Sequence, residues 1–333
     1  QLYEINLGKF RGPFNFEVHH YAADNKYQQN DLGYFTNNNY FDYGFNTWYK
    51  FNKPKSFYNN INISLGGNYS QSYSPRRYQY LDFYTRVNSQ LKNLWNVGMR
   101  AGNTAVQQDF YEARIQGRMF KKPANVRAGF YINSNLAKKY AASIDFNQTI
   151  VNQFNGNTAE LYLSNQYRFN DKLTVKFSSY NAFANNDVGF AFIENDSIHF
   201  GLRKRTTVEN IFNVKYNFNI KMGITFRARH YWSKVAYKSF YLLKEDGNLQ
   251  PENNVNTNPE RNENYFNIDM VYTWQFALGS FINIGWKDSG KLTNQYIHHK
   301  YYKNLGNTLN TPQLNNFSIK VIYFLDYLSF KKS

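Results

Sequence analysis

Apolar residues recur at every second position along most of this 333-residue chain, and this period restricts the possible folds more than any other feature. Successive side chains of a β-strand point to opposite faces, whereas a helix would place apolar residues three or four positions apart. In segment 264–276, one face would carry Phe266, Ile268, Met270, Tyr272, Trp274 and Phe276. Segments 111–119, 158–169 and 317–327 alternate in the same way. The sequence therefore predicts an all-β protein built from two-faced strands.

Weaker alternation covers most of the remaining chain, so we expect about sixteen strands in total. The additional candidate strands are 3–9, 14–22, 40–51, 61–73, 78–91, 94–101, 125–133, 140–147, 173–180, 206–218, 222–232 and 280–287. All seven prolines fall between these segments, as expected because proline lacks the N–H that a central strand donates. No linker or change of composition interrupts the pattern, so we expect residues 1–333 to form one domain with a continuous antiparallel sheet.

Two architectures use such strands, and they turn the apolar face in opposite directions. A soluble sandwich turns it toward a core, whereas a membrane barrel turns it toward lipid. Many segments here reach the roughly nine to eleven residues that a tilted strand needs to cross the hydrocarbon layer. Short turns also alternate loosely with long connections at 244–263 and 290–314, as in bacterial outer-membrane barrels. We therefore expect an antiparallel transmembrane β-barrel located in the bacterial outer membrane.

Aromatic residues support this expectation, because Tyr and Trp gather near the ends of the expected strands, where interfacial belts lie. The tryptophans expected in these belts are Trp48, Trp95, Trp232, Trp274 and Trp286. The final alternating segment, which ends at Phe330, is similar to the C-terminal signal of outer-membrane barrels.

Composition excludes several other classes of protein. The chain has no Cys, which excludes disulfide scaffolds, thiol enzymes and Cys-based zinc sites. The mean hydropathy is −0.69, and no run approaches the roughly 18 to 20 apolar residues of a transmembrane helix. Lys and Arg total 39 against 23 Asp and Glu, a net charge of +16, which favours anionic surfaces as neighbours.

Several segments resemble the C-terminal region of a large Bacteroidota family of outer-membrane barrels that is known as a domain of unknown function. The similar segments are 30–34, 110–114 followed by Gly117-Arg118 and Lys122-Pro123, 227–233 and 272–280. The resemblance implies an outer-membrane location and an upstream sugar-binding-module-like domain. It also implies further barrel strands before residue 1, so the chain would be the C-terminal part of a larger barrel. No activity comes with this family.

Candidates for chemistry are few. The pairs His19-His20 and His298-His299 could suggest a metal site, but neighbours on a strand point to opposite faces and cannot hold one ion together. The second pair falls in an expected loop, where this objection is weaker. We predict no metal site and no cofactor.

An enzyme remains an alternative, although the sequence has no Gly-x-Ser-x-Gly, phosphate-loop or dinucleotide motif. Hydrolases among membrane barrels place acids, His or Ser at one rim of the barrel. The residues to suspect here are Asp187, Glu194, Asp196 and His199. His230 is expected in the interfacial belt instead.

Charged residues on the face opposite to the apolar one would line the lumen of the barrel. They are Glu112, Arg114, Arg118, Glu160, Arg168, Lys176, Arg227, Arg229, Asp269, Lys287 and Lys320. Such a lumen could conduct anions, or its Arg and Glu side chains could form ion pairs that fill a closed barrel. We favour the filled lumen because both signs of charge occur together.

Lys and Arg in the turns would meet the phosphates of outer-membrane lipid and lipopolysaccharide. A nucleic-acid partner is not expected, because these residues are spread over most turns instead of gathering on one face. We therefore predict a non-enzymatic membrane anchor or channel component of a larger cell-surface assembly, with possible protein partners in an outer-membrane complex. The alternatives are a rim-sited outer-membrane hydrolase and a soluble all-β carbohydrate-binding protein.

Overall fold

The computed structural model describes residues 1–28, 38–297, 300–325 and 327. In this part, the chain forms eighteen β-strands and a single helix, and all paired strands run antiparallel. The prediction of an all-β antiparallel fold is therefore confirmed. Among the described residues, no helix is long and apolar enough to cross a membrane.

Sixteen strands form one sheet, in which almost every strand pairs with its neighbours along the chain. They are β1 (Leu2–Lys9), β2 (Phe14–Ala23), β3 (Tyr40–Phe51), β4 (Tyr58–Gln71), β5 (Tyr78–Leu91), β6 (Asn96–Thr104), β9 (Asn125–Asn133), β10 (Tyr140–Val151), β11 (Gly156–Arg168), β12 (Leu173–Glu194), β13 (Ser197–Asn219), β14 (Met222–Leu243), β15 (Leu249–Glu252), β16 (Arg261–Ala277), β17 (Ser280–Asn294) and β18 (Gln313–Ile322). A second, small sheet pairs β7 (Gln107–Asp109) with β8 (Phe120–Lys122). The helix α1 (Tyr301–Leu309) lies in the connection between β17 and β18.

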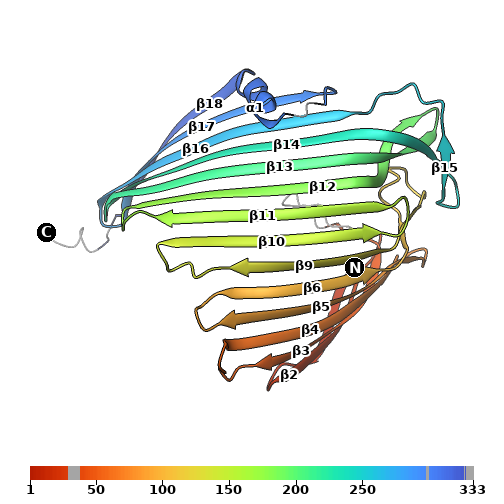
Figure 1. Cartoon of the computed structure of the whole chain (residues 1–333), viewed down its shortest axis with the longest axis horizontal. Coiled ribbons are helices and arrows are strands. Elements are labelled where there is room, and N and C mark those ends of the chain that lie inside the picture. Colours follow the sequence, from red (N-terminus) through yellow and green to blue (C-terminus); the bar gives the residue numbers. More distant parts are fainter. Residues whose placement is uncertain (29–37, 298–299, 326, 328–333) are drawn as a thin grey trace.

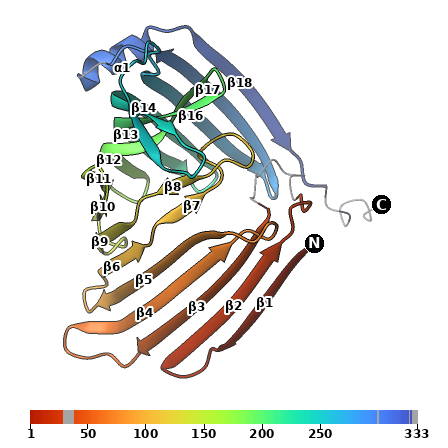
Figure 2. The same cartoon turned by 90° about the vertical axis from the view of Figure 1, so that its right-hand side faces the viewer.

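The large sheet curves into an open arc with β1 and β18 at its two ends (Figures 1 and 2). Within the described residues, β1 pairs only with β2 and β18 only with β17. The closed barrel expected from the sequence is therefore not observed in this part of the chain.

The two faces of the sheet differ sharply in chemistry. One row of directly paired residues runs Ile63, Val87, Met99, Phe130 and Phe146. The adjacent row on the other face runs Ser64, Arg86, Arg100, Gly129 and Asn147. The apolar side chains are well exposed, and Met99 reaches 69% of its possible exposure. The alternation thus builds an apolar surface on one side of the sheet and a polar surface on the other.

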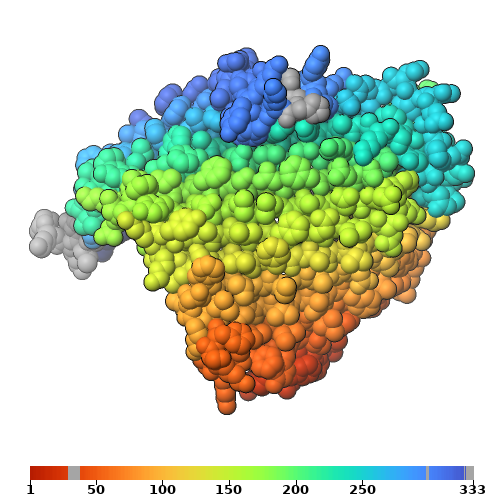
Figure 3. Space-filling view, viewed as in Figure 1, coloured from red at the N-terminus to blue at the C-terminus, as the bar shows by residue number. Residues whose placement is uncertain are grey.

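Contacts between non-adjacent strands identify the polar face as the concave one. Arg127 on β9 reaches past β6 to Asp82 on β5, and Tyr131 reaches past β6 in the same way to Asn88. Side chains converge in this manner only on the inside of a curved sheet. The apolar face is therefore convex, and Figure 3 presents it with α1 seated near the top.

The two ends of the sheet carry connections of different length, as expected from the sequence. Short turns at one end span 10–13, 52–57, 92–95, 134–139, 169–172, 220–221 and 278–279. The long connections 24–39, 105–124, 244–260 and 295–312 all lie at the other end, which also carries the shorter connections 72–77, 152–155 and 195–196. In two of the short turns, the side-chain Oδ1 atoms of Asn170 and Asn219 accept hydrogen bonds from the backbone N–H groups two and three residues later in the chain, at 2.8–3.0 Å. An asparagine side chain that holds the turn in this way explains why these turns are so compact.

The strand predicted at 111–119 is wrong. This segment is a compact loop between β7 and β8, in which Arg114 and Gly117 have positive φ angles of 59° and 82°. Ala113, which has no exposed surface, packs in a hydrophobic cluster with Phe120 and Phe200. Ala113 and Ile115 of this segment therefore pack in this cluster and do not form a strand face.

The same cluster explains a second difference from prediction, the length of β12, β13 and β14. Their extensions beyond the expected segments carry Ile198, Phe200 and Leu243 into the cluster, together with Leu249 of β15. Register shifts between β12 and β13 and between β13 and β14 interrupt the alternation there. A bulge of this kind conceals a strand from a period-two pattern.

Candidate functional site

The concave face carries eight of the eleven charged residues that the sequence assigns to a lumen. These are Glu160, Arg168, Lys176, Arg227, Arg229, Asp269, Lys287 and Lys320, on strands from β11 to β18. Arg229 forms an ion pair with Glu209. Lys287 Nζ lies 4.0 Å from Asp269 Oδ1. The structure thus brings acidic and basic side chains of neighbouring strands together on this face, and some of them form ion pairs.

The other three predicted residues, Glu112, Arg114 and Arg118, lie in the loop between β7 and β8. Glu112 Oε1 accepts the backbone N–H of Phe190 at 2.9 Å, and the guanidinium of Arg114 lies 5.4 Å from the ring centre of Phe190. Arg118 Nη2 donates to the carbonyl of Leu243 at 2.8 Å. These contacts of Glu112, Arg114 and Arg118 hold the loop against β12 and β14.

Two side chains in the long connections have shifted pKa values. Burial raises the pKa of Tyr111, and the nearby carboxylate of Asp109 adds to this shift. The backbone N–H and side chain of Asn248 lower the pKa of Asp246 in the turn between β14 and β15, because both donate to its carboxylate.

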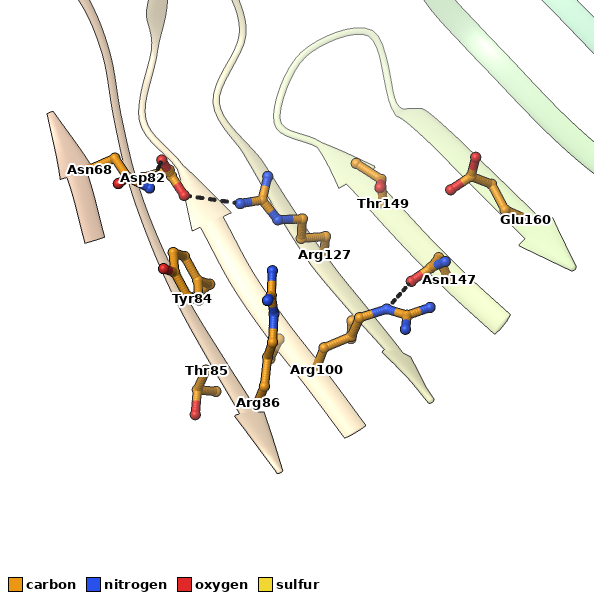
Figure 4. A pocket seen from close by; sticks show the side chains of 12 residues that line it. Asn68, Asp82, Tyr84, Thr85, Arg86, Arg100, Arg127, Asn147, Thr149 and Glu160 are labelled. Carbon is orange, nitrogen blue, oxygen red and sulfur yellow. Dashed lines mark hydrogen bonds and ion pairs between the residues drawn. The ribbon is translucent and has the colours of Figure 1, made fainter. Parts of the chain in front are cut away.

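A hollow of about 530 Å³ opens on the concave face across β4, β5, β6, β9, β10 and β11 (Figure 4). Its lining includes three arginines that the sequence analysis missed, Arg86, Arg100 and Arg127, with Asp82 and Tyr84. Each of the three alternates along its strand with an exposed apolar residue of the convex face. That alternation could have identified them from sequence.

Two of these arginines have carboxylate partners. Arg127 Nη2 lies 3.2 Å from Asp82 Oδ2. Arg100 pairs with Asp145, and its Nε donates to Asn147 Oδ1 at 2.6 Å. The remaining arginine, Arg86, is exposed and lies 5.0 Å from the ring centre of Tyr84.

A second hollow, of about 520 Å³, lies further along the concave face over β11 to β16. Lys176, Arg227 and Asp269 contribute to its lining. Both hollows are polar and charged, and neither contains a serine or histidine that could act as a nucleophile or a base. Their chemistry suits charge recognition.

The four residues suspected of hydrolysis do not form one constellation. Asp187 pairs with two arginines, Arg203 and Arg205, at 2.8 Å each. Glu194 accepts a hydrogen bond from Thr257, while Asp196 lies in the turn between β12 and β13 with a φ angle of 61°. The buried His199 stacks on Phe192, with its Nδ1 2.9 Å from Glu252 Oε2.

The histidine pair on β2 points to opposite faces. His20 stacks on Tyr43, and its Nε2 lies 3.0 Å from the hydroxyl of Tyr3. His19 stacks on Tyr21 instead. The pair His298-His299 lies outside the described residues, and among those that are described no group of three acidic or histidine residues could hold a metal ion.

Four of the five tryptophans lie on the convex face or at its edge. Trp95 and Trp274 lie beside short turns, Trp286 donates to Asn315 at 2.8 Å, and Trp232 donates to Asn262 at 2.7 Å beneath α1. Trp48 differs, because it shares a row with Ser64 on the concave face.

Comparison with known proteins adds one decisive observation. The model of the domain of unknown function DUF5916 matches residues 2–333. The chain belongs to this family. Membership in a family of unknown function agrees with the resemblance seen in the sequence. No curated protein and no solved structure matches the chain.

Proposed function

We propose that this DUF5916 domain forms most of the wall of a transmembrane β-barrel in the bacterial outer membrane. The single observation that carries the proposal is the chemistry of the sheet, which is apolar and exposed on its convex face and charged on its concave face. A soluble protein gains nothing from leaving so much apolar surface in water, whereas a barrel in lipid needs this arrangement.

The ends and edges of the sheet support the same function. One side of the sheet carries only short turns and the other carries all the long connections, as in outer-membrane barrels. The unpaired edges of β1 and β18 require partners in a membrane, because lipid cannot satisfy free backbone N–H and C=O groups. We infer that further strands between β1 and β18 close the sheet, so that this domain is one part of a larger barrel.

In this proposal the barrel is not an enzyme and acts as a membrane anchor or channel component of a larger cell-surface assembly. The proposed source is a Bacteroidota outer membrane, with a sugar-binding-module-like domain in the same protein. Lys53 and Lys55 in one short turn, and Lys138 and Lys139 in another, lie where they would meet the phosphates of phospholipids in the inner leaflet, because the short turns of such barrels face the periplasm.

A pair of neighbouring substitutions on β10 tests the membrane orientation. Ile144 lies on the convex face between Ile132 and Leu163, and Ser143 lies on the concave face between Asn133 and Ser164. We expect Ile144→Arg to lower the free energy of unfolding in lipid vesicles by up to about 2–4 kcal/mol, depending on its depth in the bilayer, because the guanidinium enters the hydrocarbon layer.

Ser143→Arg is the matched control, and it should lower the free energy of unfolding far less. Both values come from urea titrations of the intact protein that contains this domain, reconstituted in vesicles and followed by tryptophan fluorescence. Equal losses at the two positions would exclude lipid contact on the convex face.

A further inference from the structure

We propose that the hollow over β5, β6 and β9 is a binding site for an oxyanion, a carboxylate or phosphate group, held between Arg86 and Arg100. The site depends only on side chains of the concave face, so it goes beyond the membrane function and does not rest on it.

The first argument is the placement of like charges. Arg86 on β5 and Arg100 on β6 are directly opposite each other in the ladder between the two strands. Directly opposed like charges destabilise an antiparallel pair unless something neutralises them. Asp145 already pairs with Arg100, so Arg86 is the charge of this pair that an anion bound between the two guanidinium groups would neutralise.

The second argument is the number of acidic groups near the three arginines. Asp82 pairs with Arg127, and Asp145 pairs with Arg100. Glu160, the other carboxylate of the lining, accepts the hydroxyl of Tyr180 at 2.6 Å. Asp82, Asp145 and Glu160 thus each have a partner other than Arg86, whose guanidinium faces the ring of Tyr84.

The third argument is that glycines leave room for two of the three arginines. Gly129 lies opposite Arg100 on β9, and a Cβ atom there would lie 3.1 Å from Arg100 Nε. Gly102 lies opposite Arg127 on β6, where a Cβ atom would lie 3.0 Å from Arg127 Nε. A side chain at Gly129 would therefore crowd Arg100, and one at Gly102 would crowd Arg127.

The geometry also selects the class of ligand. A guanidinium donates two parallel N–H groups, which match the oxygen pairs of a carboxylate or phosphate and not a spherical ion such as chloride. Figure 4 shows Arg86 extending between Tyr84 and Arg100 on the floor of the hollow. The hollow has a volume of about 530 Å³, which is in the range of small-molecule sites. The oxyanion can therefore belong to a larger molecule.

The test is calorimetric binding of inorganic phosphate, acetate and chloride to the detergent-folded chain at equal ionic strength. We expect saturable binding of phosphate or acetate but not of chloride, and the stronger of the two identifies the class of ligand. Arg86→Gln should raise the Kd about tenfold, and Arg86→Lys should weaken binding by a smaller factor. Lys320→Gln removes one charge from the same face far from the hollow and should leave the Kd unchanged.

A measurement on the unaltered chain covers the case in which Arg86→Gln fails to fold. Phenylglyoxal modifies accessible arginines, and peptide mass spectrometry reports the extent at each site. Phosphate should protect Arg86 from modification, whereas chloride should not. Chloride binding as tight as phosphate binding, an unchanged Kd in folded Arg86→Gln, or no protection of Arg86 would each overturn the proposal.

Discussion

Asn304 illustrates how single residues on the convex face combine burial with polarity. It has no exposed surface, although it belongs to a helix that sits on the outside of the sheet. Its side-chain amide exchanges hydrogen bonds with Asn264, whose Nδ2 donates to Asn304 Oδ1 at 3.2 Å. Asn262 donates to the same oxygen at 3.4 Å. This buried amide cluster holds α1 against β16, and the hydroxyl of Tyr301, bonded to His230 and Asn210, holds the start of the helix against β14 and β13.

We therefore expect Asn304→Leu to detach α1 from the sheet. The substitution removes both hydrogen bonds between Asn304 and Asn264, and a buried polar group left without its partner costs about 1–3 kcal/mol. Chymotrypsin cleavage after the exposed Tyr302 should become faster in the folded chain. Lys303→Gln, on the exposed side of the same helix, is the control and should cleave at the original rate. An unchanged rate in Asn304→Leu would show that other contacts hold the helix.

At the scale of elements, the sequence identified the regular strands well and the irregular ones poorly. The expected segments 158–169 and 264–276 agree with β11 and β16 to within a few residues, because each keeps one face apolar without interruption. The helix α1 was missed, since asparagine and threonine hold it and no apolar period marks it. Of the site, the sequence supplied Glu160 and the general polarity of the concave face. The alternation could also have assigned Arg86 and Arg100 to the concave face, but not their position opposite each other, which depends on strand register.

The contact between the β7–β8 loop and the turn after β14 gives a prediction for two elements that are distant in sequence. Gly247 has a φ angle of 83°, its carbonyl accepts Lys121 N–H at 2.9 Å, and an added Cβ would lie 2.7 Å from Met119 Sδ. We expect Gly247→Ala to strain this turn by about 1–2 kcal/mol through its left-handed backbone alone. The clash with Met119 should then separate the two elements.

Hydrogen exchange of the Lys121 amide measures that separation. The matched control is Gly117→Ala in the same loop, which has a φ angle of 82° and no atom within 4 Å of the added Cβ. Exchange at Lys121 should accelerate much more in Gly247→Ala than in Gly117→Ala. Similar acceleration in both variants would mean that backbone strain alone, and not the packing on Met119, controls the contact.

At the scale of the whole molecule, the convex face and the two edges of the sheet need different surroundings. Any lipid or detergent can cover the apolar convex face, but neither can supply hydrogen-bond partners for the backbone edges of β1 and β18. The proposed barrel therefore predicts different behaviour for edge and central strands when the environment changes. A central strand such as β13 has partners on both sides in either case.

Hydrogen exchange followed by mass spectrometry can compare the 333-residue chain in detergent with the intact protein in outer membranes. In detergent, we expect amides of β1 and β18 to exchange much faster than those of β13, because about half of the amides of an edge strand lack a partner. In the membrane, closure of the barrel pairs these amides, so their exchange should slow to the rate of β13. The amides of β13 should exchange slowly in both samples, which controls for a general effect of detergent. Rapid exchange of β1 and β18 in the membrane would contradict closure and would leave the open sheet as the functional form.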